Sequence, residues 1–511
     1  MKRTIFLITL TFLFSVYLPG QNDSPVNFKA LDSYYEQMVN DWDVPGMAVG
    51  VVKDGELLFS GAYGVLEEGK KATPDKNTLY GIASNSKAFT SAIIAMLVEE
   101  GRLNWDDKVR DYLPYFEVYD PWVSHEATIR DLLSHRIGLG TFSGDVIWYK
   151  SDFSAEEIVR KAKHIPQAFD FRAGYGYSNI MYIAAGELIK AVTGKPWSEN
   201  VKERIFKPLG MNRSITSPEL LDEKGNYVTP HARQEEKNIP IAWVNWEEVG
   251  ALGGVISSVE DLSKWMIFNL NHGIVGEDTL LTEKNINLMW TPHNNFVVDH
   301  FSSNDFNTHF RAYGLGWGLS DFHGRMRVAH TGAIDGMITG ISLIPDENLG
   351  VVVLTNGMKT PYTAAANYAL ELFLGLTPRD WSAELLEKGK KRKQSDTRIS
   401  SRKEKRVLNT EPSLSPEKYT GTYYSDIHGN IYISLENDQL RMEFEHSEPL
   451  SAILKHWHYD VWEIIWDEKH AWFDFGTVKF NTDNNLNILG MDFDVPNNDI
   501  FFDELKPYRV H

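Results

Sequence analysis

The feature that most constrains this chain is a short polar stretch that leads directly into a long apolar run. Gly81–Lys87 (GIASNSK) precedes Ala88–Val98, and Glu99-Glu100-Gly101 follows it. Most residues of the run are good helix formers, and a glycine at its end is typical of a C-terminal cap. The pattern predicts one buried helix whose first turn carries Ser84, with Lys87 one turn further on the same face.

This spacing favours nucleophilic catalysis. An alcohol attacks poorly at neutral pH, but an amine whose pKa is lowered by burial can remove its proton. The start of a helix also favours negative charge on the attacking oxygen. Alone, the pattern is weak: it recurs at Ser400–Lys403 and Ser415–Lys418, and an N-terminal capping serine would explain it equally well.

Two further motifs follow in the chain. Tyr177-Ser178-Asn179 lies in a glycine-rich loop before a predicted helix, where its phenol and amide can face a cleft. A nearby lysine ammonium would lower the phenol pKa and allow proton relay, while the amide would orient a substrate. His330-Thr331-Gly332 ends a predicted strand, where glycine lets a substrate backbone lie against the sheet edge. Each motif by itself also suits a structural role.

Length and charge limit the possible classes of protein. With 511 residues we expect two domains, and a formal net charge of −19 argues against nucleic-acid binding. The first 20 residues have the charged start, apolar middle and small-residue exit of a signal peptide, with a retained membrane anchor as the alternative. The chain has no cysteine, so it has no disulfide, no lipidated cysteine and no Cys-type zinc site. We therefore expect a periplasmic or secreted protein without stable membrane insertion.

The rest of the chain predicts an α+β domain followed by a small barrel. Apolar runs on either side of Asp54-Gly55 predict a β-hairpin, the middle reads as helical, and strands return after residue 312. One antiparallel sheet with strands from both ends of the domain, covered by helices, satisfies this pattern. The expected strands are Tyr313–Leu319, Arg327–His330, Thr339–Pro345 and Leu349–Thr355. The expected helices are Ile129–Ser134, Ala155–Lys163, Ile180–Thr193, Ala364–Leu374 and one that starts at Val259–Leu262.

The C-terminal third differs in composition. Lys388–Arg406 holds ten Lys or Arg against two acids, which is typical of a solvated linker. The alternative is an electrostatic contact with an anionic polysaccharide, a lipid or the acidic body of the protein. From Ser415 onward, short strands and turns predict an antiparallel β-barrel. Its expected strands include Ala471–Phe475, and its expected core contains Trp457, Trp462, Trp466 and Trp472.

The three motifs in this order resemble the penicillin-recognising serine hydrolases, in the branch of class C β-lactamases, DD-peptidases and D-aminopeptidase-esterases. The resemblance covers about residues 28–375, and residues 415–511 resemble the lipocalin-like barrel that follows the catalytic domain in some members. It implies a β-lactamase/DD-peptidase-like fold with a helical subdomain. The implied divisions are a signal peptide (1–20), a hydrolase domain (28–376), a basic linker (377–414) and a barrel (415–511).

The resemblance also implies roles for individual residues. Ser84 would attack the carbonyl, with Lys87 and Tyr177 moving protons, and either of these two could be the general base. The substrate would be held by Asn179 and by the strand edge of His330, Thr331 and Gly332. The oxyanion hole would consist of the backbone N–H groups of Ser84 and Ala333.

One residue departs from the class C β-lactamases, which have lysine where this chain has His330. A neutral imidazole grips a carboxylate weakly, so antibiotic resistance is not the leading expectation. We expect an exported serine hydrolase that acts through an acyl-enzyme on peptides with D-residues. The alternatives are a carboxylesterase or deacetylase, a weak β-lactamase, and a penicillin-binding sensor or scaffold without turnover. The expected partner is a small-molecule or peptide substrate, homo-oligomers remain open, and no metal or cofactor is implied because the histidines show no zinc-ligand spacing.

Overall fold

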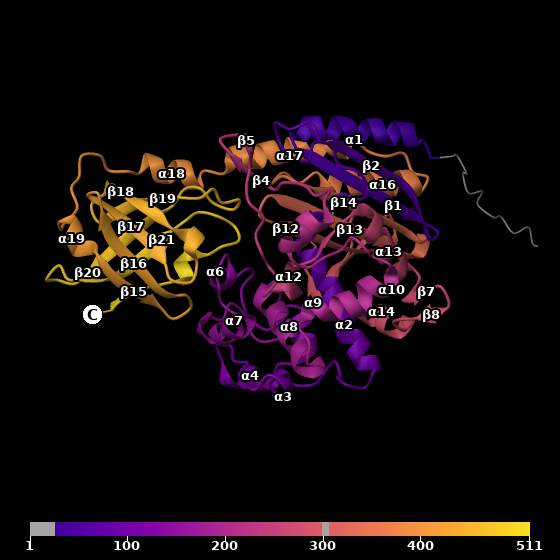
Figure 1. The fold of residues 1–511 in the computed structure, drawn as a ribbon, viewed down its shortest axis with the longest axis horizontal. Helices are drawn as coiled ribbons and strands as arrows, with labels where there is room; N and C mark the ends of the chain where they lie inside the picture. The colour runs from indigo at the N-terminus through magenta and orange to yellow at the C-terminus, as the bar shows by residue number, and fades with distance from the viewer. Residues whose placement is uncertain (1–25, 299–305, 511) are drawn as a thin grey trace, which may run out of the picture.

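The computed structural model describes residues 26–298 and 306–510, which form two bodies joined by a helical connection (Figure 1). The larger body combines a central sheet with helices, and the smaller one is a closed antiparallel barrel of eight strands. The predicted signal peptide lies outside the described residues. Among the residues that the structure describes, no helix is both long and apolar enough to cross a bilayer.

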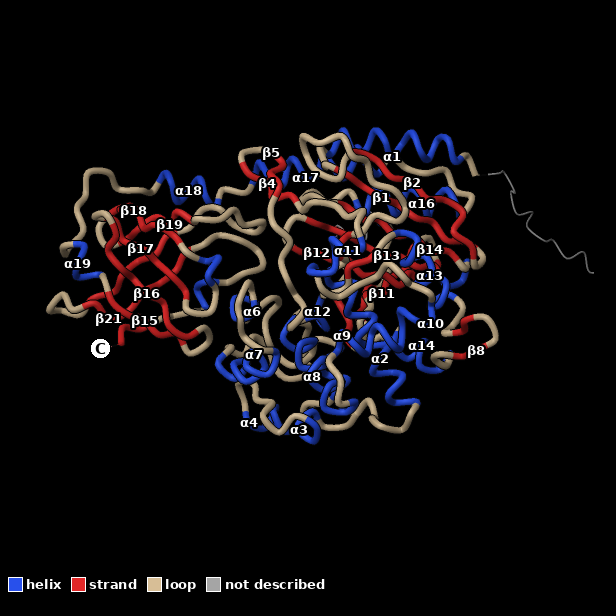
Figure 2. Tube along the Cα trace, viewed as in Figure 1, coloured by secondary structure: helices blue, strands red, loops and turns tan. Residues whose placement is uncertain are grey.

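The predicted hairpin is present at one edge of the central sheet (Figure 2). β1 (Gly46–Lys53) and β2 (Glu56–Gly64) turn through Asp54 and Gly55, whose φ angles are +53° and +81°. Two consecutive positive φ angles match the right-handed twist of a hairpin, which is why Asp-Gly is a strong turn signal. β1 also pairs with β14 (Leu349–Thr355), so the start of the domain joins its last strand.

The sheet continues with strands from the second half of the domain. The expected single strand Tyr313–Leu319 is wrong, because the chain reverses between Tyr313 and Gly318. Gly316 has a φ of +79°, and a Cβ there would lie 2.8 Å from the Lys87 carbonyl oxygen, so the turn packs directly against α2 (Ser86–Glu99). In sheet order the strands are β2, β1, β14, β13 (Met337–Ile344), β12 (Arg325–Ile334), β11 (Gly318–Phe322), β10 (Arg311–Tyr313) and β9 (Asn294–Phe296).

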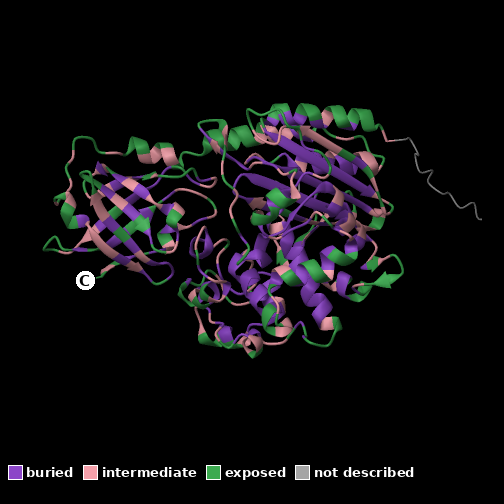
Figure 3. Cartoon of the chain, viewed as in Figure 1, coloured by how far each residue is buried: buried purple, intermediate pink, exposed green. Residues whose placement is uncertain are grey.

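Helices cover both faces of the sheet, so the central strands β13 and β14 are buried along their whole length (Figure 3). Val49 and Val51 of β1 pack with α1 (Phe28–Trp42) and α16 (Tyr362–Phe373). The alternate residues of β1 belong to the other core cluster, together with α13 (Val259–Leu270) and α2 (Ser86–Glu99). Ser258 caps α13 by accepting from the Asp261 amide, as its sequence predicts.

The middle of the chain forms the expected helical subdomain, held around α2 and α8. Its helices are α3 (Val109–Tyr112), α4 (Pro121–Glu126), α5 (Ile129–Leu133), α6 (Asp145–Trp148), α7 (Ala155–Lys161), α8 (Asn179–Thr193), α9 (Trp197–Val201), α10 (Lys207–Leu209), α11 (Leu221–Lys224), α12 (Gly250–Gly253) and α14 (Glu283–Met289). Short strand pairs complete it: β3 (Tyr80–Gly81) with β6 (Ile256–Ser257), β4 (His231–Gln234) with β5 (Lys237–Pro240), and β7 (Ile274–Val275) with β8 (Asp278–Thr279).

The basic segment between the two bodies is helical over much of its length, in α17 (Trp381–Ser395) and α18 (Arg398–Glu404). Trp381 is buried and donates from Nε1 to Glu371 Oε2 at 2.8 Å, which ties the start of α17 to the larger body. The guanidinium of Arg402 binds both oxygens of Asp494 at 2.7 Å. Part of this positive charge therefore rests against acidic groups of the protein itself, as one sequence alternative proposed.

The barrel closes where its first and last strands pair, Thr422 opposite Val510. Trp457 and Trp462 are buried, as expected of core residues. The predictions for Ala471–Phe475 and Trp472 are wrong, because that segment is a loop packed on the larger body. The elements are α19 (Pro416–Tyr419), β15 (Gly421–Ser425), β16 (Gly429–Glu436), β17 (Gln439–Phe444), β18 (Ala452–His458), β19 (Val461–Trp466), β20 (Thr477–Thr482), β21 (Ile488–Asp494) and β22 (Tyr508–Val510).

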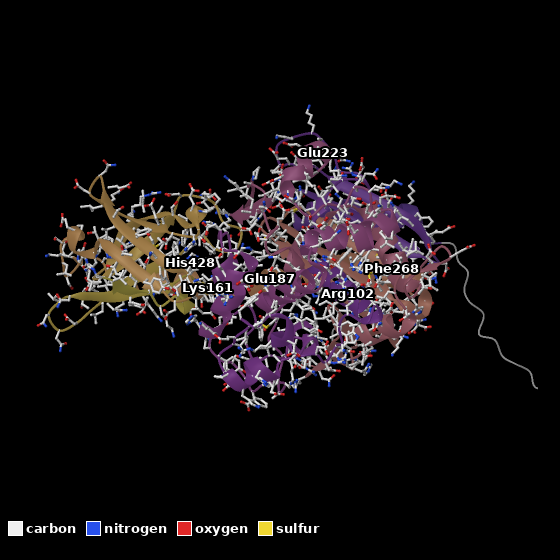
Figure 4. The ribbon with its side chains drawn as sticks, turned by 60° about the horizontal axis from the view of Figure 1, so that its bottom comes forward. Arg102, Lys161, Glu187, Glu223, Phe268 and His428 are labelled. Atoms are coloured by element: carbon white, nitrogen blue, oxygen red, sulfur yellow. The ribbon has the colours of Figure 1, made fainter. Side chains whose placement is uncertain are left out.

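The two bodies share a buried junction. Lys161 of α7 and His428 of the barrel both lie there (Figure 4). Burial lowers the pKa of His428 to about 3, with smaller electrostatic effects of the neighbouring His446 and Lys161 in the same direction, so its ring stays neutral. Asp152 accepts a hydrogen bond from His446 Nδ1 at 2.8 Å, and its backbone amide donates to the His446 carbonyl. The barrel is thus docked on the loop between α6 and α7.

Candidate active site

Ser84 lies on a strained turn at the start of α2. The preceding residue, Ala83, has a φ of +47°, which is costly for a residue with a Cβ. Ala83–Asn85 form a single 3₁₀ turn that leads into α2. From Thr78 to Leu97 every residue is buried except Ser84, which is partly exposed. The predicted helix is therefore present, and this turn presents one hydroxyl to solvent.

Lys87 has three oxygen partners in a dry environment. Its Nζ lies 3.0 Å from Ser84 Oγ, 2.8 Å from Asn179 Oδ1 and 2.8 Å from the Leu252 carbonyl oxygen. Burial lowers its pKa well below the usual lysine range, although the charge of Asp145 acts in the opposite direction. A neutral amine here donates to two oxygens and keeps a lone pair for the Ser84 hydroxyl proton.

Tyr177 lies beside Lys87 and Ser84, but its phenol pKa shifts in the direction opposite to the one that the sequence predicts. Lys87 Nζ is 4.8 Å from the centre of its ring, and the His135 ring packs on it at 4.3 Å. Burial raises the pKa of the phenol well above its usual value, although a hydrogen bond with Ser84 lowers it in part. The predicted lowering of the Tyr177 pKa is wrong, because the cost of desolvating the phenolate outweighs the hydrogen bond with Ser84. Tyr177 therefore keeps its proton, and Lys87 is the better base.

Asn179 connects Lys87 to an acid that the sequence analysis missed. Its Oδ1 accepts from Lys87, while its Nδ2 donates to Asp145 Oδ2 at 2.6 Å. Asp145, at the start of α6, also accepts from Trp148 Nε1 at 2.9 Å and is buried. Burial raises the pKa of the Asp145 carboxyl well above its usual value. One sequence signal was available: a lone acid that directly precedes the apolar residues 146–148.

The third motif forms an open strand edge next to Ser84. Pairing of β12 with β11 ends where Ala329 faces Gly318, whereas pairing with β13 continues to Ile334. The five residues from His330 to Ile334 therefore have one free edge. Gly332 is required there, because a Cβ would lie 2.1 Å from the carbonyl oxygen of Ile82, two residues before Ser84. An extended substrate can pair with this edge.

His330 carries no charge in this site. Its Nε2 lies 2.9 Å from the Tyr313 hydroxyl, and its Nδ1 lies 2.6 Å from the Thr331 carbonyl oxygen. Because a carbonyl only accepts, Nδ1 carries the proton and Nε2 accepts from the tyrosine. Burial, with a smaller electrostatic effect of the adjacent Lys87 in the same direction, lowers the pKa of His330 to about 3. The imidazole therefore orients Tyr313, and Thr331, which is exposed, is left to contact a substrate.

A cavity of about 560 Å³ lies over Ser84 and is closed on one side by the barrel. The barrel contributes Trp472, Asp499 and Ile500 to its lining. The Asp499 loop is rigid, since Asn497 Oδ1 accepts from the amides of residues 499 and 500 at 2.9 and 2.7 Å. Burial raises the pKa of Asp499 to about 6. The lining also includes Ser84, Tyr177, Asn179, His330, Thr331 and Ala333, so most of the predicted site residues meet in one place.

The comparisons with known proteins agree with this arrangement. A Beta-lactamase family model matches residues 31–374. The chain belongs to the Beta-lactamase family. Residues 405–506 match a domain of unknown function, DUF3471. The family match and its hydrolase relatives make this protein a serine hydrolase, and the resemblance to penicillin-recognising enzymes is confirmed.

Two sequence relatives and one solved structure show what the chain is similar to. The chain is 29% identical to "Unguisins hydrolase ungD'" of Aspergillus campestris, over 79% of this chain and 77% of that protein. It is 26% identical to "Penicillin-binding protein 4" of Amycolatopsis lactamdurans, over 63% and 84%. An octameric penicillin-binding protein homologue from Pyrococcus abyssi has the same fold, with a TM-score of 0.61 and 22% identity over 92% of this chain and 98% of that one.

Among the described ranges 26–298 and 306–510, no group of three or more His, Asp or Glu side chains is arranged to hold a metal ion. The other two Ser-x-x-Lys matches lie away from this site. Ser400 is on α18, where its hydroxyl donates to the Thr397 carbonyl, and Ser415 precedes α19. The fold therefore places the Tyr-x-Asn and His-Thr-Gly segments beside one of the three Ser-x-x-Lys matches, Ser84–Lys87.

Proposed function

We propose that this serine hydrolase cleaves the amide bond of short peptides that contain D-residues and carry a free amino group. The observation that carries the proposal is Asp499, which the barrel places in the cavity over Ser84. Among the described residues, no ion pair involves its carboxylate. A partly buried acid that forms no ion pair favours a positively charged ligand group. The neutral His330 supports the same choice, because it offers little attraction to the carboxylate of a β-lactam.

The proposed reaction follows from the contacts around Ser84. Neutral Lys87 takes the hydroxyl proton as Ser84 Oγ bonds to the substrate carbonyl carbon, whose oxygen becomes an oxyanion. The backbone N–H groups of Ser84 and Ala333 stabilise that charge. The C–N bond then breaks, Tyr177 donates its proton to the leaving amine, and Lys87 returns a proton to Tyr177. Water, deprotonated by the same groups, releases the acid and restores Ser84.

A carboxylic ester is the second candidate substrate, since the same residues would acylate on it. The cavity favours it in one respect: its lining is largely apolar and aromatic, with Tyr175, Trp246 and Phe296 among the residues. β-Lactams are the third candidate substrate. A sensor without turnover would acylate once and stop.

The test is a substrate panel with purified protein: D- and L-amino-acid amides, nitrophenyl esters and a chromogenic cephalosporin. We expect turnover of D-amino-acid amides and covalent labelling by a serine-directed fluorophosphonate, both abolished in Ser84→Ala. Faster turnover of esters or of the cephalosporin would assign those substrates instead. A stoichiometric burst without turnover would indicate a sensor, and unchanged activity in Ser84→Ala would reject the site.

We also propose export to the periplasm or outside the cell, on the strength of the first 20 residues. Self-association is a further proposal, because the similar archaeal structure is described as octameric. Light scattering of the purified chain would show a multiple of its 58.3 kDa mass if it assembles.

A further inference from the structure

The barrel holds a loop of the hydrolase domain through one carboxylate. Glu504 lies in a short 3₁₀ turn, Phe502–Glu504, between β21 and β22. Its Oε2 accepts from the Gly144 amide at 2.7 Å, and its Oε1 accepts from the Ser143 hydroxyl. Burial raises the Glu504 pKa, although both contacts oppose this, so the carboxylate lies in a largely dry interface. Hydrogen bonds to a charged acceptor are among the stronger ones in proteins.

The residue held in this way leads directly to Asp145. Gly144 has a φ of +82°, and a Cβ there would lie 2.2 Å from Ile165 Cδ1. Its conformation is therefore narrowly set, and it precedes the first residue of α6. Because Asp145 is the next residue, the position of its carboxylate depends on the backbone that Glu504 holds.

Asp145 in turn fixes which way the Asn179 amide faces. Asn179 Nδ2 donates to Asp145 Oδ2, and this contact leaves Asn179 Oδ1 facing Lys87. A flipped amide would place an NH₂ group against the amine and remove one of its three partners. The chain of contacts therefore runs from Glu504 through Ser143, Gly144, Asp145 and Asn179 to Lys87 and Ser84.

A second contact holds the other end of the same loop. Asp335, in the turn between β12 and β13, accepts from the Tyr149 hydroxyl at 2.7 Å and from Trp472 Nε1 of the barrel at 3.2 Å. Asp335 follows Ala333, the expected oxyanion donor, by two residues. The barrel thus contacts residues 143–149 near both ends and touches the turn beside the oxyanion site.

We propose that the barrel is part of the catalytic apparatus, with Glu504 and Asp145 as positioning residues that hold Asn179 and Lys87 in place for attack by Ser84. This inference rests on the proposed acyl-enzyme mechanism. It differs from a role in limiting substrate size, because it requires the barrel for acylation by any substrate, however small.

The experiment measures the single-turnover acylation rate with a small nitrophenyl acetate ester, which needs no contact with Trp472 or Ile500. Glu504→Ala and Asp145→Asn should acylate about 10-fold to 100-fold more slowly, with little change in KM, because misplacement by about 1 Å has effects of this size. Glu504→Asp, which keeps the carboxylate, should recover part of the rate. Ser143→Ala should lose less, and its effect should vanish in the Glu504→Ala background.

Asp152→Asn is the matched control, since it weakens the His446 contact across the same interface without touching residues 143–145. It should acylate within about twofold of the unchanged protein, and thermal melting should show that all variants fold. A wild-type rate in Glu504→Ala would overturn the inference, as would equal losses in Asp152→Asn. Absence of acylation at Ser84 in the unchanged protein would contradict the proposed acyl-enzyme mechanism. That result differs from a variant that is acylated at the wild-type rate, which would contradict only the positioning role.

Discussion

At the scale of single residues, the pKa of Lys87 is subject to two opposing effects. Burial favours the neutral amine, and the charge of Asp145 favours the ammonium. The other titratable groups around it are His135, His330 and Tyr177, whose pKa shifts keep all three uncharged near neutral pH. Lys87 and Asp145 therefore set the pH dependence of attack.

Acylation should rise with pH through the lowered Lys87 pKa and reach its plateau well below the usual lysine value of about 10.4. Asp145→Asn removes the carboxylate that favours the protonated form of Lys87, so the acid limb of the pH–rate profile should move to lower pH. Single-turnover rates from pH 4 to 10 would show this, whatever the height of the plateau. A limb that moved to higher pH in Asp145→Asn would contradict the assignment of Lys87 as base.

Gly332 offers a second test at this scale. The added methyl of Gly332→Ala would lie 2.1 Å from the Ile82 carbonyl oxygen, so strand β12 and the Ser84 turn must separate. We expect acylation to fall about 100-fold and stability to fall by about 1–3 kcal/mol.

Gly389→Ala on α17 is the matched control. A Cβ there meets nothing within 4 Å, so the substitution should raise stability by up to about 1 kcal/mol through helix propensity. Thermal melting and the nitrophenyl assay would compare the two variants. Equal activity in Gly332→Ala would mean that the strand edge does not set the position of Ser84.

At the scale of elements, helix α5 anchors the loop that carries Tyr177. Asp131 is fully buried and accepts from Arg136 Nε at 2.5 Å, from Arg172 Nη2 at 2.6 Å and from the Thr128 amide at 2.9 Å. Arg172 belongs to the same loop as Tyr177. Burial alone would raise the Asp131 pKa, but hydrogen bonds from Arg172 and Thr128 lower it overall. The ion cluster therefore connects α5 to the start of α8.

Asp131→Asn should lower stability by about 1–3 kcal/mol, because the buried side chain at this position loses the charge that accepts hydrogen bonds from Arg136 and Arg172. A lowered folded-state pKa contributes stability above the unfolded value of about 3.9, which is lost as pH falls through the folded value. The variant should therefore lose part of the acid dependence of stability between about pH 5 and 2. Urea unfolding at several pH values tests this, with Asp106→Asn as the control.

Asp106 is an exposed acid that pairs with Arg130 at 2.8 Å, and its substitution should cost less than about 1 kcal/mol. Equal effects of the two substitutions would show that the buried cluster contributes nothing beyond a surface ion pair.

Elements whose signals are local could be predicted from the sequence. The Asp54-Gly55 hairpin, the Ser258 cap and the apolar α2 each depend on residues a few positions apart. The three motifs could be located, but their meeting around Ser84 followed only from the family resemblance. Asp145 and Glu504 could not be found, because no local pattern marks their partners: Asp145 binds Asn179, 34 residues further along the chain, and Glu504 binds Gly144, 360 residues away on the other body. The prediction that Trp472 belongs to the barrel core is wrong for the same reason, because no local pattern shows that its loop contacts Asp335.

At the scale of the whole molecule, the barrel supplies one wall of the cavity over Ser84. Asp499 lies on a loop whose shape is set by Asn497, so its carboxylate is presented by a rigid support. Its charge is close enough to Asp145 to raise the pKa of that acid. A substrate ammonium placed between the barrel and the hydrolase domain would relieve this repulsion as well as pair with Asp499.

Asp499→Asn should therefore raise KM for D-amino-acid amides with a free amino group by about 10-fold to 100-fold, the effect of losing one charged hydrogen bond of about 1.5–3 kcal/mol. KM for the N-acetylated amides should not change. Since burial raises the Asp499 pKa to about 6, the wild-type KM for the free amines should rise as pH falls through that value, and the variant should lack this step. Asp503→Asn, an exposed acid nearby, is the control. Equal losses for free and acetylated amides would show that Asp499 shapes the cavity wall without binding an amine.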